Sequence, residues 1–484
     1  MYAFVEASSP WLDEHIERFI RHHAPDAICV RDLADIPSSA ENVFQWCCGQ
    51  QLNRNFALLN KSGGLINAYP NSDALARKDH LGVVVDFWTA KRPDSILKNH
   101  VPQTVRLTLD YAEYVDEALM AADDLTLLYS LEENESLEPR DRQYWILKPA
   151  LVDCGAGIRI FSTMEELASH LELAEYEESD EETEEEEDEE EEGSTEASEV
   201  DDPIELEKGY DKSFSPTLSQ PGLDSLDVLV TTGSGPAKPK IEAGIREKKP
   251  SYVFKEGGRI PSSEMRAFVA QKYLSSIATI ENRKWHVRAY VLSVGRLKVH
   301  VFRDMLLLLA GEDYQGPWEN PSLKASLTNT ALQDADVVEA KQSIRAFWDM
   351  PEDLFPQEDW KEGLFKQIRD ITSELFRAAA HTMADKFTTI DRCFELFAVD
   401  FLVDDKGSAW LLEVNETPAF YQQGVAGPMS LRLMESAVCV VMEHMGHAHI
   451  GEARNAAVRR RMVDVLDETE KLAKSNIVEI MADR

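Results

Sequence analysis

The chain has 484 residues, of which 43% are hydrophobic, so it is long enough for two or three domains with a sizeable core. The formal net charge is −38, but 22 of the acidic residues lie between positions 172 and 207, and the remainder has the charge of an ordinary acidic protein. The chain lacks the excess of basic residues that would indicate nucleic-acid binding. The six cysteines show no zinc spacing.

The N-terminus has no basic segment followed by an apolar run, and no apolar stretch reaches the 18 to 20 or so residues of a membrane span. We therefore expect no membrane partner, and the cysteine pattern fits reduced thiols in a cytosolic or nuclear protein best. Residues 2–5 and 27–30 read as short strands around an amphipathic helix at 11–23, with Pro10 where a first helical turn tolerates proline. This pattern predicts a small open-sheet domain.

A Tyr-Pro-Asn-Ser turn at 69–72 leads into a helix that carries Arg77 and Lys78. A basic pair at a helix start is more often a solvated face than a site, so neither residue is selected from its position alone.

Residues 144–147 predict a strand that ends at Lys148, and a Gly-Ala-Gly loop beginning at Gly155 leads into a strand at 158–161. A lysine beside a glycine loop can bind phosphates. The lysine supplies a positive charge, and the glycines let backbone N–H groups approach the phosphate oxygens. The loop is not a Walker motif, and such a loop is more often a simple hairpin turn.

From about 174 to 250 the sequence is first Glu-rich and then rich in Gly, Pro, Ser and Lys. Such a segment buries too little apolar surface to offset its ordering entropy, which predicts a disordered insertion within a domain. Ordered sequence resumes with a strand at 265–274 and two antiparallel strands joined at Gly295. Helices are expected at 335–348, 360–386 and 430–444, and one or two charged helices at 456–482.

Residues 394–403 and 410–414 predict a β-hairpin over the turn 404–407. Pairing Val403 with Trp410 would set Asp400 opposite Glu413, with Asn415 on the same face. Buried carboxylates at such a short separation repel each other unless a cation lies between them. Oxygen ligands of this kind suit Mg²⁺. The alternative is a structural hairpin whose acids meet arginines in the core.

Six segments occur in the order and approximate spacing of the tubulin–tyrosine ligase family, which the chain resembles from about 50 to 425. They are residues 67–81, 145–158, 271–274, 283–288, 327–329 and 393–418. The last, FELFAVDFLVDDKGSAWLLEVNETP, is the most specific. The resemblance implies an α/β (α+β) ATP-grasp fold.

By this resemblance ATP lies between two α+β subdomains and Mg²⁺ accompanies it. Lys148 would contact phosphate beneath a loop containing Gly155, and Lys284 would also contact the nucleotide. The adenine hinge would be Gln271, Lys272, Tyr273 and Leu274; the phosphate-side clip would be Thr328 and Asn329; and the Mg²⁺ ligands would be Asp400, Glu413 and Asn415.

The implied reaction phosphorylates a peptide carboxylate with ATP, after which the amine of an amino acid attacks the acyl-phosphate. The catalytic charges would come from Lys148, Arg288 and Glu413. The implied domains are an N-terminal domain at 1–77, a central ATP-grasp subdomain at 78–270 interrupted at 174–250, a C-terminal ATP-grasp subdomain at 271–450, and a helical tail at 451–484.

Four positions depart from the family pattern. His286 replaces a ribose-contacting acid, Leu308 aligns with an arginine, Ser326 replaces a histidine, and Cys154 replaces a basic residue before the glycine loop. Each loss could cost a few kcal/mol of transition-state stabilisation. Nucleotide binding is therefore better supported than amino-acid ligation.

Two functions follow. The first is a ligase acting on an acidic tail such as that of tubulin, in the cytoplasm or on microtubules. The second is a weakly catalytic nucleotide-binding scaffold in RNA granules, because fungal relatives include a processing-body protein linked to mRNA decapping factors. The acidic segment could also occupy the acceptor groove as a pseudosubstrate, although a solvated linker or docking strip is the simpler interpretation.

Overall fold

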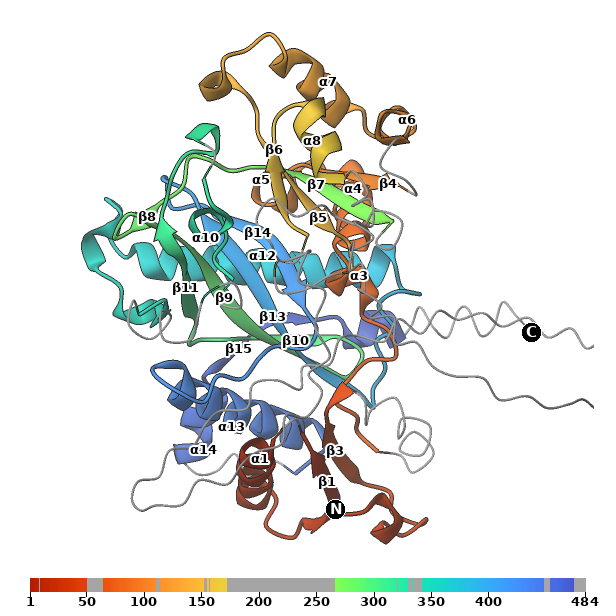
Figure 1. Ribbon diagram of the computed structural model, residues 1–484. Coiled ribbons are helices and arrows are strands. Elements are labelled where there is room, and N and C mark those ends of the chain that lie inside the picture. Colours follow the sequence, from red (N-terminus) through yellow and green to blue (C-terminus); the bar gives the residue numbers. More distant parts are fainter. Residues whose placement is uncertain are drawn as a thin grey trace, which may run out of the picture. The chain divides into compact units, whose positions relative to one another are not determined.

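The computed structural model describes residues 1–7, 9–49, 64–109, 114–151, 155, 157–171, 266–319, 321–329, 333, 342–447 and 453–473 (Figure 1). The insertion predicted at 174–250 lies outside these residues, as does Cys154. The described residues carry three β-sheets.

The first sheet is parallel and has the order β2-β1-β3. Its strands are β1 (Tyr2–Glu6), β2 (Ile28–Val30) and β3 (Val43–Cys47). Helix α1 (Pro10–His23) connects β1 to β2, and the Ser9 side chain accepts a hydrogen bond from the Leu12 N–H at its start. This confirms the predicted opening β-α-β pattern.

The second sheet is antiparallel and has the order β4-β7-β5-β6. Its strands are β4 (Thr104–Thr108), β5 (Trp145–Pro149), β6 (Arg159–Phe161) and β7 (Ala267–Lys272), so β7 joins the sheet from the far side of the insertion. Three helices pack on one face: α6 (Val115–Met120), α7 (Thr126–Asn134) and α8 (Met164–Leu171).

Side chains alternate in direction along these strands, so the sheet has one apolar face and one polar face. Trp145 and Leu147 of β5 pack under the three helices. Lys148 consequently points to the opposite face, where helix α4 (Lys78–Lys91) lies against β4 and β7. The short helices α3 (Asp73–Ala76) and α5 (Leu97–His100) flank α4 in the sequence.

The third sheet has 8 strands and is built around the long central strand β9 (Arg283–Val294). One edge of β9 pairs with β13 (Phe394–Val403), which in turn pairs with β14 (Ala409–Asn415). The other strands are β8 (Thr279–Ile280), β10 (Lys298–Phe302), β11 (Leu306–Asp313), β12 (Ile344–Ala346) and β15 (Met462–Asp467).

Each face of this sheet carries its own hydrophobic core. Val287, Ala289 and Val291 of β9 pack with helix α12 (Trp360–Thr382), whereas Tyr290 and Leu292 pack with helix α13 (Ala426–His444). Figure 1 shows α12 and α13 on opposite sides of the sheet. Helix α10 (Leu323–Ser326) follows β11, and helix α14 (Ala453–Arg459) follows α13.

Two helix predictions are wrong over part of their length. The expected helix at 335–348 instead contains β12, an edge strand beside β11, and a 3₁₀ turn at Phe347–Asp349, while 334–341 lie outside the described residues. The one or two helices expected at 456–482 are wrong at Met462–Asp467, which form β15 and pair antiparallel with β10; residues 456–459 belong to α14, 469–473 are helical, and 474–482 lie outside the described residues. Both strands are short and charged, so only pairing with a neighbouring strand decides their conformation.

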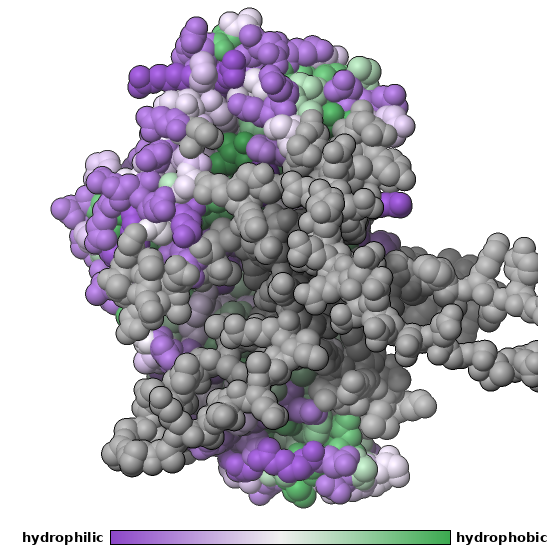
Figure 2. Space-filling model, viewed as in Figure 1, coloured by the Kyte–Doolittle hydropathy of each residue, from purple (hydrophilic) through white to green (hydrophobic). Residues whose placement is uncertain are grey.

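None of the helices in the described ranges is both long and apolar enough to cross a membrane. The view in Figure 2 shows mainly hydrophilic residues on the described surface, with hydrophobic residues in separate areas.

Candidate nucleotide site

Lys148 lies on the polar face of the second sheet, beside Gln271 on the neighbouring strand β7. Its ammonium donates to the Gln271 side-chain carbonyl at 2.8 Å, and it is only 6% exposed. Burial lowers the pKa of Lys148 to about 8; Glu413 opposes this shift, and Lys78 and Lys284 add to it. A buried lysine with cationic neighbours is a receptor for anionic groups.

Lys284, at the start of β9, is the second buried lysine. Burial lowers its pKa to about 7. Its ammonium donates to the Tyr273 hydroxyl at 3.2 Å and lies 4.5 Å from the centre of the Tyr273 ring. Tyr273 belongs to a small apolar cluster with Ile146, Ile158 and Leu327, among other residues. Apolar side chains and buried cations are thus adjacent here, as binding of a base and its phosphates requires.

The predicted hinge is the end of β7 and the residues after it. The Tyr273 N–H donates to the Tyr144 carbonyl at 2.9 Å, while the Lys272 side chain is exposed and Leu274 is half-buried. The Lys272 N–H donates to the Gln103 carbonyl at 2.8 Å, so the hinge role of Lys272 stays a prediction. The Gln271 side chain points to Lys148, a contact that the sequence analysis did not predict.

Asp400 on β13 is the centre of a buried charge cluster on the main sheet. The Arg288 guanidinium donates to both of its oxygens, at 2.9 and 2.8 Å, and the Asn415 amide donates at 3.3 Å. The His286 Nε2 lies 3.6 Å from the nearer oxygen. Burial works to raise the pKa of Asp400, but Arg288 and His286 hold it well below its usual range.

His286 also joins this cluster to the predicted phosphate clip. Its Nδ1 lies 2.5 Å from the Thr328 hydroxyl. Thr328 is buried, and Asn329 beside it is half-buried. His286, which stands where the family pattern has an acid, is therefore fixed between Asp400 and Thr328.

A β-bulge sets the face on which Glu413 lies. Val403 pairs with Ala409, and not with Trp410 as the predicted register requires, but the register shifts at Leu412 so that Asp400 still faces Glu413. Leu411 and Val414 therefore point into the core shared with α12, whereas Asn415 reaches Asp400 and Glu413 lies on the same face as Asn415. The predicted facing of the two acids is confirmed, although the pairing next to the turn is wrong.

Lys78 completes the cluster, and the sequence analysis did not select it. Its ammonium, on the first residue of α4, lies 3.7 Å from the Glu413 carboxylate. Lys78, Lys148, Gln271 and Leu411 also line one cavity between α4, the second sheet and β14. The only sequence signal for Lys78 was its place in the segment 67–81 that resembles the family.

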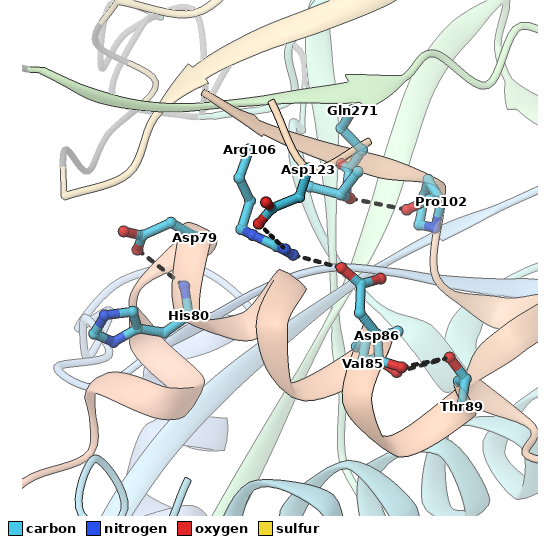
Figure 3. A network of polar contacts seen from close by, with 10 residues as sticks. Asp79, His80, Val85, Asp86, Thr89, Pro102, Arg106, Asp123 and Gln271 are labelled. Atoms are coloured by element: carbon cyan, nitrogen blue, oxygen red, sulfur yellow. Dashed lines mark hydrogen bonds and ion pairs between the residues drawn. The ribbon is translucent and has the colours of Figure 1, made fainter. Parts of the chain in front are cut away.

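Helix α4 is joined to the second sheet by a network of polar contacts (Figure 3). Arg106 of β4 pairs with Asp86 of α4 and approaches Asp123 at 4.0 Å. Its side chain crosses Gly82, where a Cβ would lie 3.6 Å from the guanidinium. These contacts fix the helix that carries Lys78.

The glycine loop joins β5 to β6 as an antiparallel hairpin. Gly155 has φ +79° and Gly157 has φ +68°, which favours glycine at both positions. The residues between Leu151 and Gly155 lie outside the described residues, so a role of the loop in phosphate binding stays a prediction.

Two of the departures, His286 and Leu308, lie on the same face of the main sheet. Leu308 pairs directly with His286 and is buried in the core under α13, so this wall is apolar where the family pattern has an arginine. Ser326 is buried at the end of α10.

The side chains present fit a hard cation such as Mg²⁺ at Asp400, Glu413 and Asn415. Two carboxylates and an amide lie on the adjacent strands β13 and β14, and Oδ1 of Asp400 keeps acceptor capacity beyond its bond to Arg288, whereas Oδ2 accepts from both Arg288 and Asn415. Among the described residues, no three or more His, Cys, Asp or Glu side chains form a metal cluster by themselves. Such a cation would therefore depend on the amide, water and phosphate for its other ligands.

Comparison with known proteins gives a consistent assignment. Residues 57–199 and 237–438 match the family model described as Tubulin-tyrosine ligase family. A probable tubulin–tyrosine ligase of Schizosaccharomyces pombe is 34% identical over 395 residues, which is 81% of each chain. The probable tubulin–tyrosine ligase PBY1 of Saccharomyces cerevisiae is 30% identical, over 79% of this chain and 43% of that protein.

The fold is similar to a solved structure, the C-terminal domain of K. lactis Pby1, described as an ATP-grasp enzyme interacting with the mRNA decapping enzyme Dcp2. The two superpose with a TM-score of 0.58 at 21% identity, over 96% of this chain and 99% of that one. The predicted ATP-grasp fold is thereby confirmed.

Proposed function

Because this chain belongs to the tubulin–tyrosine ligase family and has the ATP-grasp fold, we propose that it binds Mg-ATP and ligates an amino acid to a protein carboxylate. The nucleotide would lie between the subdomains predicted at 78–270 and 271–450. The acceptor would be an acidic tail such as that of tubulin.

The observation that carries the proposal is the balance of charge in the site. Lys78, Lys148, Lys284 and Arg288 converge on a region whose neighbouring carboxylates are Asp400 and Glu413. Lys148 and Lys284 are buried and have lowered pKa values, so their charged forms lack compensation. A polyphosphate would supply it.

In the proposed reaction an oxygen of the acceptor carboxylate attacks the γ-phosphorus of ATP, the bond to the bridging oxygen breaks, and ADP leaves. The amine of the incoming amino acid then attacks the acyl carbon, and phosphate leaves as the amide forms. Lys148 and Arg288 would stabilise the charge on the transferring oxygens. A bound Mg²⁺, held by Asp400, Glu413 and Asn415, would neutralise phosphate charge.

Several relatives support tubulin as the acceptor class. They include a tubulin glycylase of Tetrahymena thermophila and the tubulin polyglutamylase TTLL7 of Homo sapiens, which match 32% and 35% of this chain. These names describe those proteins; the amino acid and the acceptor of this chain are to be tested.

The test is ATP turnover coupled to incorporation of radiolabelled tyrosine, glutamate or glycine into tubulin-tail peptides. ADP release should require the acceptor and should be abolished in Glu413→Gln. The matched control is Glu358→Gln, at an exposed glutamate outside the site, which should behave as wild type. Absence of incorporation with every amino acid tested would contradict the ligase proposal.

A second candidate is a nucleotide-binding scaffold in mRNA-decay granules. Two observations favour it: Leu308 makes part of the site wall apolar, and the similar K. lactis domain is described as interacting with a decapping enzyme. In this case Mg-ATP binds without turnover, and the protein retains purified decapping enzyme but not tubulin. Acceptor-dependent turnover with recovery of tubulin alone would exclude it. Either function places the protein in the cytoplasm, at granules or at microtubules.

A further inference from the structure

Lys148 is held by a series of hydrogen bonds that begins at Pro102 and Thr104, outside the six short segments whose sequence resembles the family. The Lys148 ammonium donates to Gln271 Oε1 at 2.8 Å, and Gln271 Nε2 donates to the Thr104 hydroxyl oxygen at 3.2 Å. The Thr104 hydroxyl in turn donates to the Pro102 carbonyl at 2.9 Å. Figure 3 labels Gln271 and Pro102, which lie at the two ends of the part of this hydrogen-bond series that the figure shows.

The direction of each bond follows from chemistry. The Pro102 carbonyl can only accept, so the single hydroxyl proton of Thr104 is used there. The Thr104 oxygen must then accept, and only the NH₂ group of Gln271 can donate to it. The amide oxygen of Gln271 is thereby left facing Lys148, which has donors alone.

The backbone places these groups in a row. Thr104 of β4 and Gln271 of β7 are register partners, and Ile146, two residues before Lys148 on β5, is the next partner of Gln271. Thr104, Gln271 and Lys148 line the same cavity, together with Lys78. The chain of bonds therefore leads from the edge strand to the lysine proposed to bind phosphate.

We infer that Thr104 is a positioning residue for nucleotide binding, because it fixes the Gln271 amide in the one orientation that gives the Lys148 ammonium an acceptor. This inference rests on the proposed binding of Mg-ATP. Without the hydroxyl, the amide can rotate and present its NH₂ group to the ammonium, which puts donor against donor. Lys148 then loses its fixed position in the cavity.

The first measurement is the affinity for a Mg-bound, non-hydrolysable ATP analogue by calorimetry. Thr104→Val keeps the shape but removes the hydroxyl, and the loss of one such hydrogen bond should weaken binding about 3- to 10-fold. Thr104→Ser keeps the hydroxyl and should restore the affinity. Thr108→Val, at an exposed threonine on the same strand, should leave the affinity unchanged.

A double-mutant cycle separates positioning from general damage to β4. Once Gln271→Ala has removed the amide, adding Thr104→Val should have no further effect on affinity. An equal loss in both backgrounds, or wild-type affinity in a stably folded Thr104→Val, would overturn the inference. If Thr104→Val does not fold, Thr104→Ala is carried through the same cycle.

A measurement without nucleotide keeps this inference distinct from the proposed function. The rate at which an amine-reactive reagent modifies Lys148, followed by mass spectrometry, should rise in Thr104→Val but not in Thr108→Val. If wild type binds no nucleotide while this difference persists, the proposed function fails and the positioning role stands. An unchanged rate overturns the positioning role.

Discussion

Arg288 and Asp400 face each other in register across β9 and β13, and the guanidinium binds both carboxylate oxygens, at 2.9 and 2.8 Å. Asp400 is 3% exposed, so almost no water screens the pair. The sequence had left two roles open for this acid, a cation ligand and a partner of a core arginine. The contacts in the structure show Asp400 as the partner of a core arginine. To bind a cation as well, the same carboxylate would have to serve Arg288 and the cation together.

Arg288→Met should destabilise the fold strongly, because it leaves the Asp400 charge buried without its main partner. The expected loss is about 3–5 kcal/mol in the free energy of unfolding, from urea titrations. Adding Asp400→Asn to Arg288→Met should recover part of that loss, since no charge then remains unpaired. A loss below about 1 kcal/mol, the range of an exposed pair, would contradict this account.

The same pair has a defined pH dependence. The pKa of Asp400 is lowered in the folded state, so its contribution to stability is present in full above about pH 4 and is lost as the pH falls through the folded pKa. The stability difference between wild type and Asp400→Asn should therefore be constant from pH 5 to 8 and narrow below about pH 4. A difference that narrows on the alkaline side would show that another group is responsible.

Lys78 should contribute to nucleotide affinity even though the sequence analysis did not select it. Lys78→Met should weaken Mg-ATP binding about tenfold, the scale of a charge-assisted hydrogen bond of roughly 1.5 kcal/mol. The control is Lys91→Met, at the opposite end of α4, where the lysine is exposed. Equal affinities of the two variants, measured by calorimetry at one ionic strength, would remove Lys78 from the site.

The hairpin shows how far the sequence could reach into the site. Alternation and turn composition correctly predicted the two strands and the facing of Asp400 and Glu413. The pairing beside the turn was displaced by one residue, and the bulge at Leu412 compensates for it. A bulge depends on how Leu411 and Val414 fit the core under α12, and no periodicity within the hairpin encodes that fit.

Long-range contacts account for the rest of what the sequence missed. The residues of β15 read as part of a charged helix, and only pairing with β10, more than a hundred residues earlier, makes them a strand. Lys78 and Thr104 likewise carry no local signal, because each acts through a partner that is remote in sequence, Glu413 and Gln271 respectively. Lys148 could be selected because it ends a strand beside a glycine loop, and Asp400, Glu413 and Asn415 because they lie in one short hairpin with turn composition.

Nucleotide binding should be accompanied by proton uptake at pH 8. Burial lowers the pKa of Lys148 to about 8 and that of Lys284 to about 7, so both are partly or largely neutral in the free protein at this pH. Phosphate favours their charged forms and raises both pKa values, which should draw in about one proton per nucleotide.

Calorimetry of Mg-ATP binding in buffers of different ionisation enthalpy measures this uptake directly. Lys284→Met should reduce the number of protons taken up, whereas Lys91→Met should not change it. A binding enthalpy independent of the buffer, or proton release, would show that the buried lysines stay charged in the free protein.

The end of β15 should be a determinant of stability, because it holds Glu468 against helix α12. Glu468 is 1% exposed, and it accepts from Arg377 of α12 at 2.9 Å and from Lys471 at 2.9 Å. Glu468→Gln keeps the volume and removes the charge, so it should lower the free energy of unfolding by about 1.5–3 kcal/mol. The control is Glu132→Gln, at an exposed glutamate on α7.

The pH dependence of the free energy of unfolding at acid pH tests the contacts of Glu468 with Arg377 and Lys471. Burial works to raise the pKa of Glu468, but Lys471 and Arg377 outweigh it and lower the pKa overall. The contribution is therefore present above about pH 4.3 and is lost as the pH falls through the lowered value. The advantage of wild type over Glu468→Gln, followed by thermal unfolding, should thus shrink between about pH 5 and 3. If it instead grows in that range, Glu468 is protonated in the folded protein, and β15 is held to α12 by packing alone.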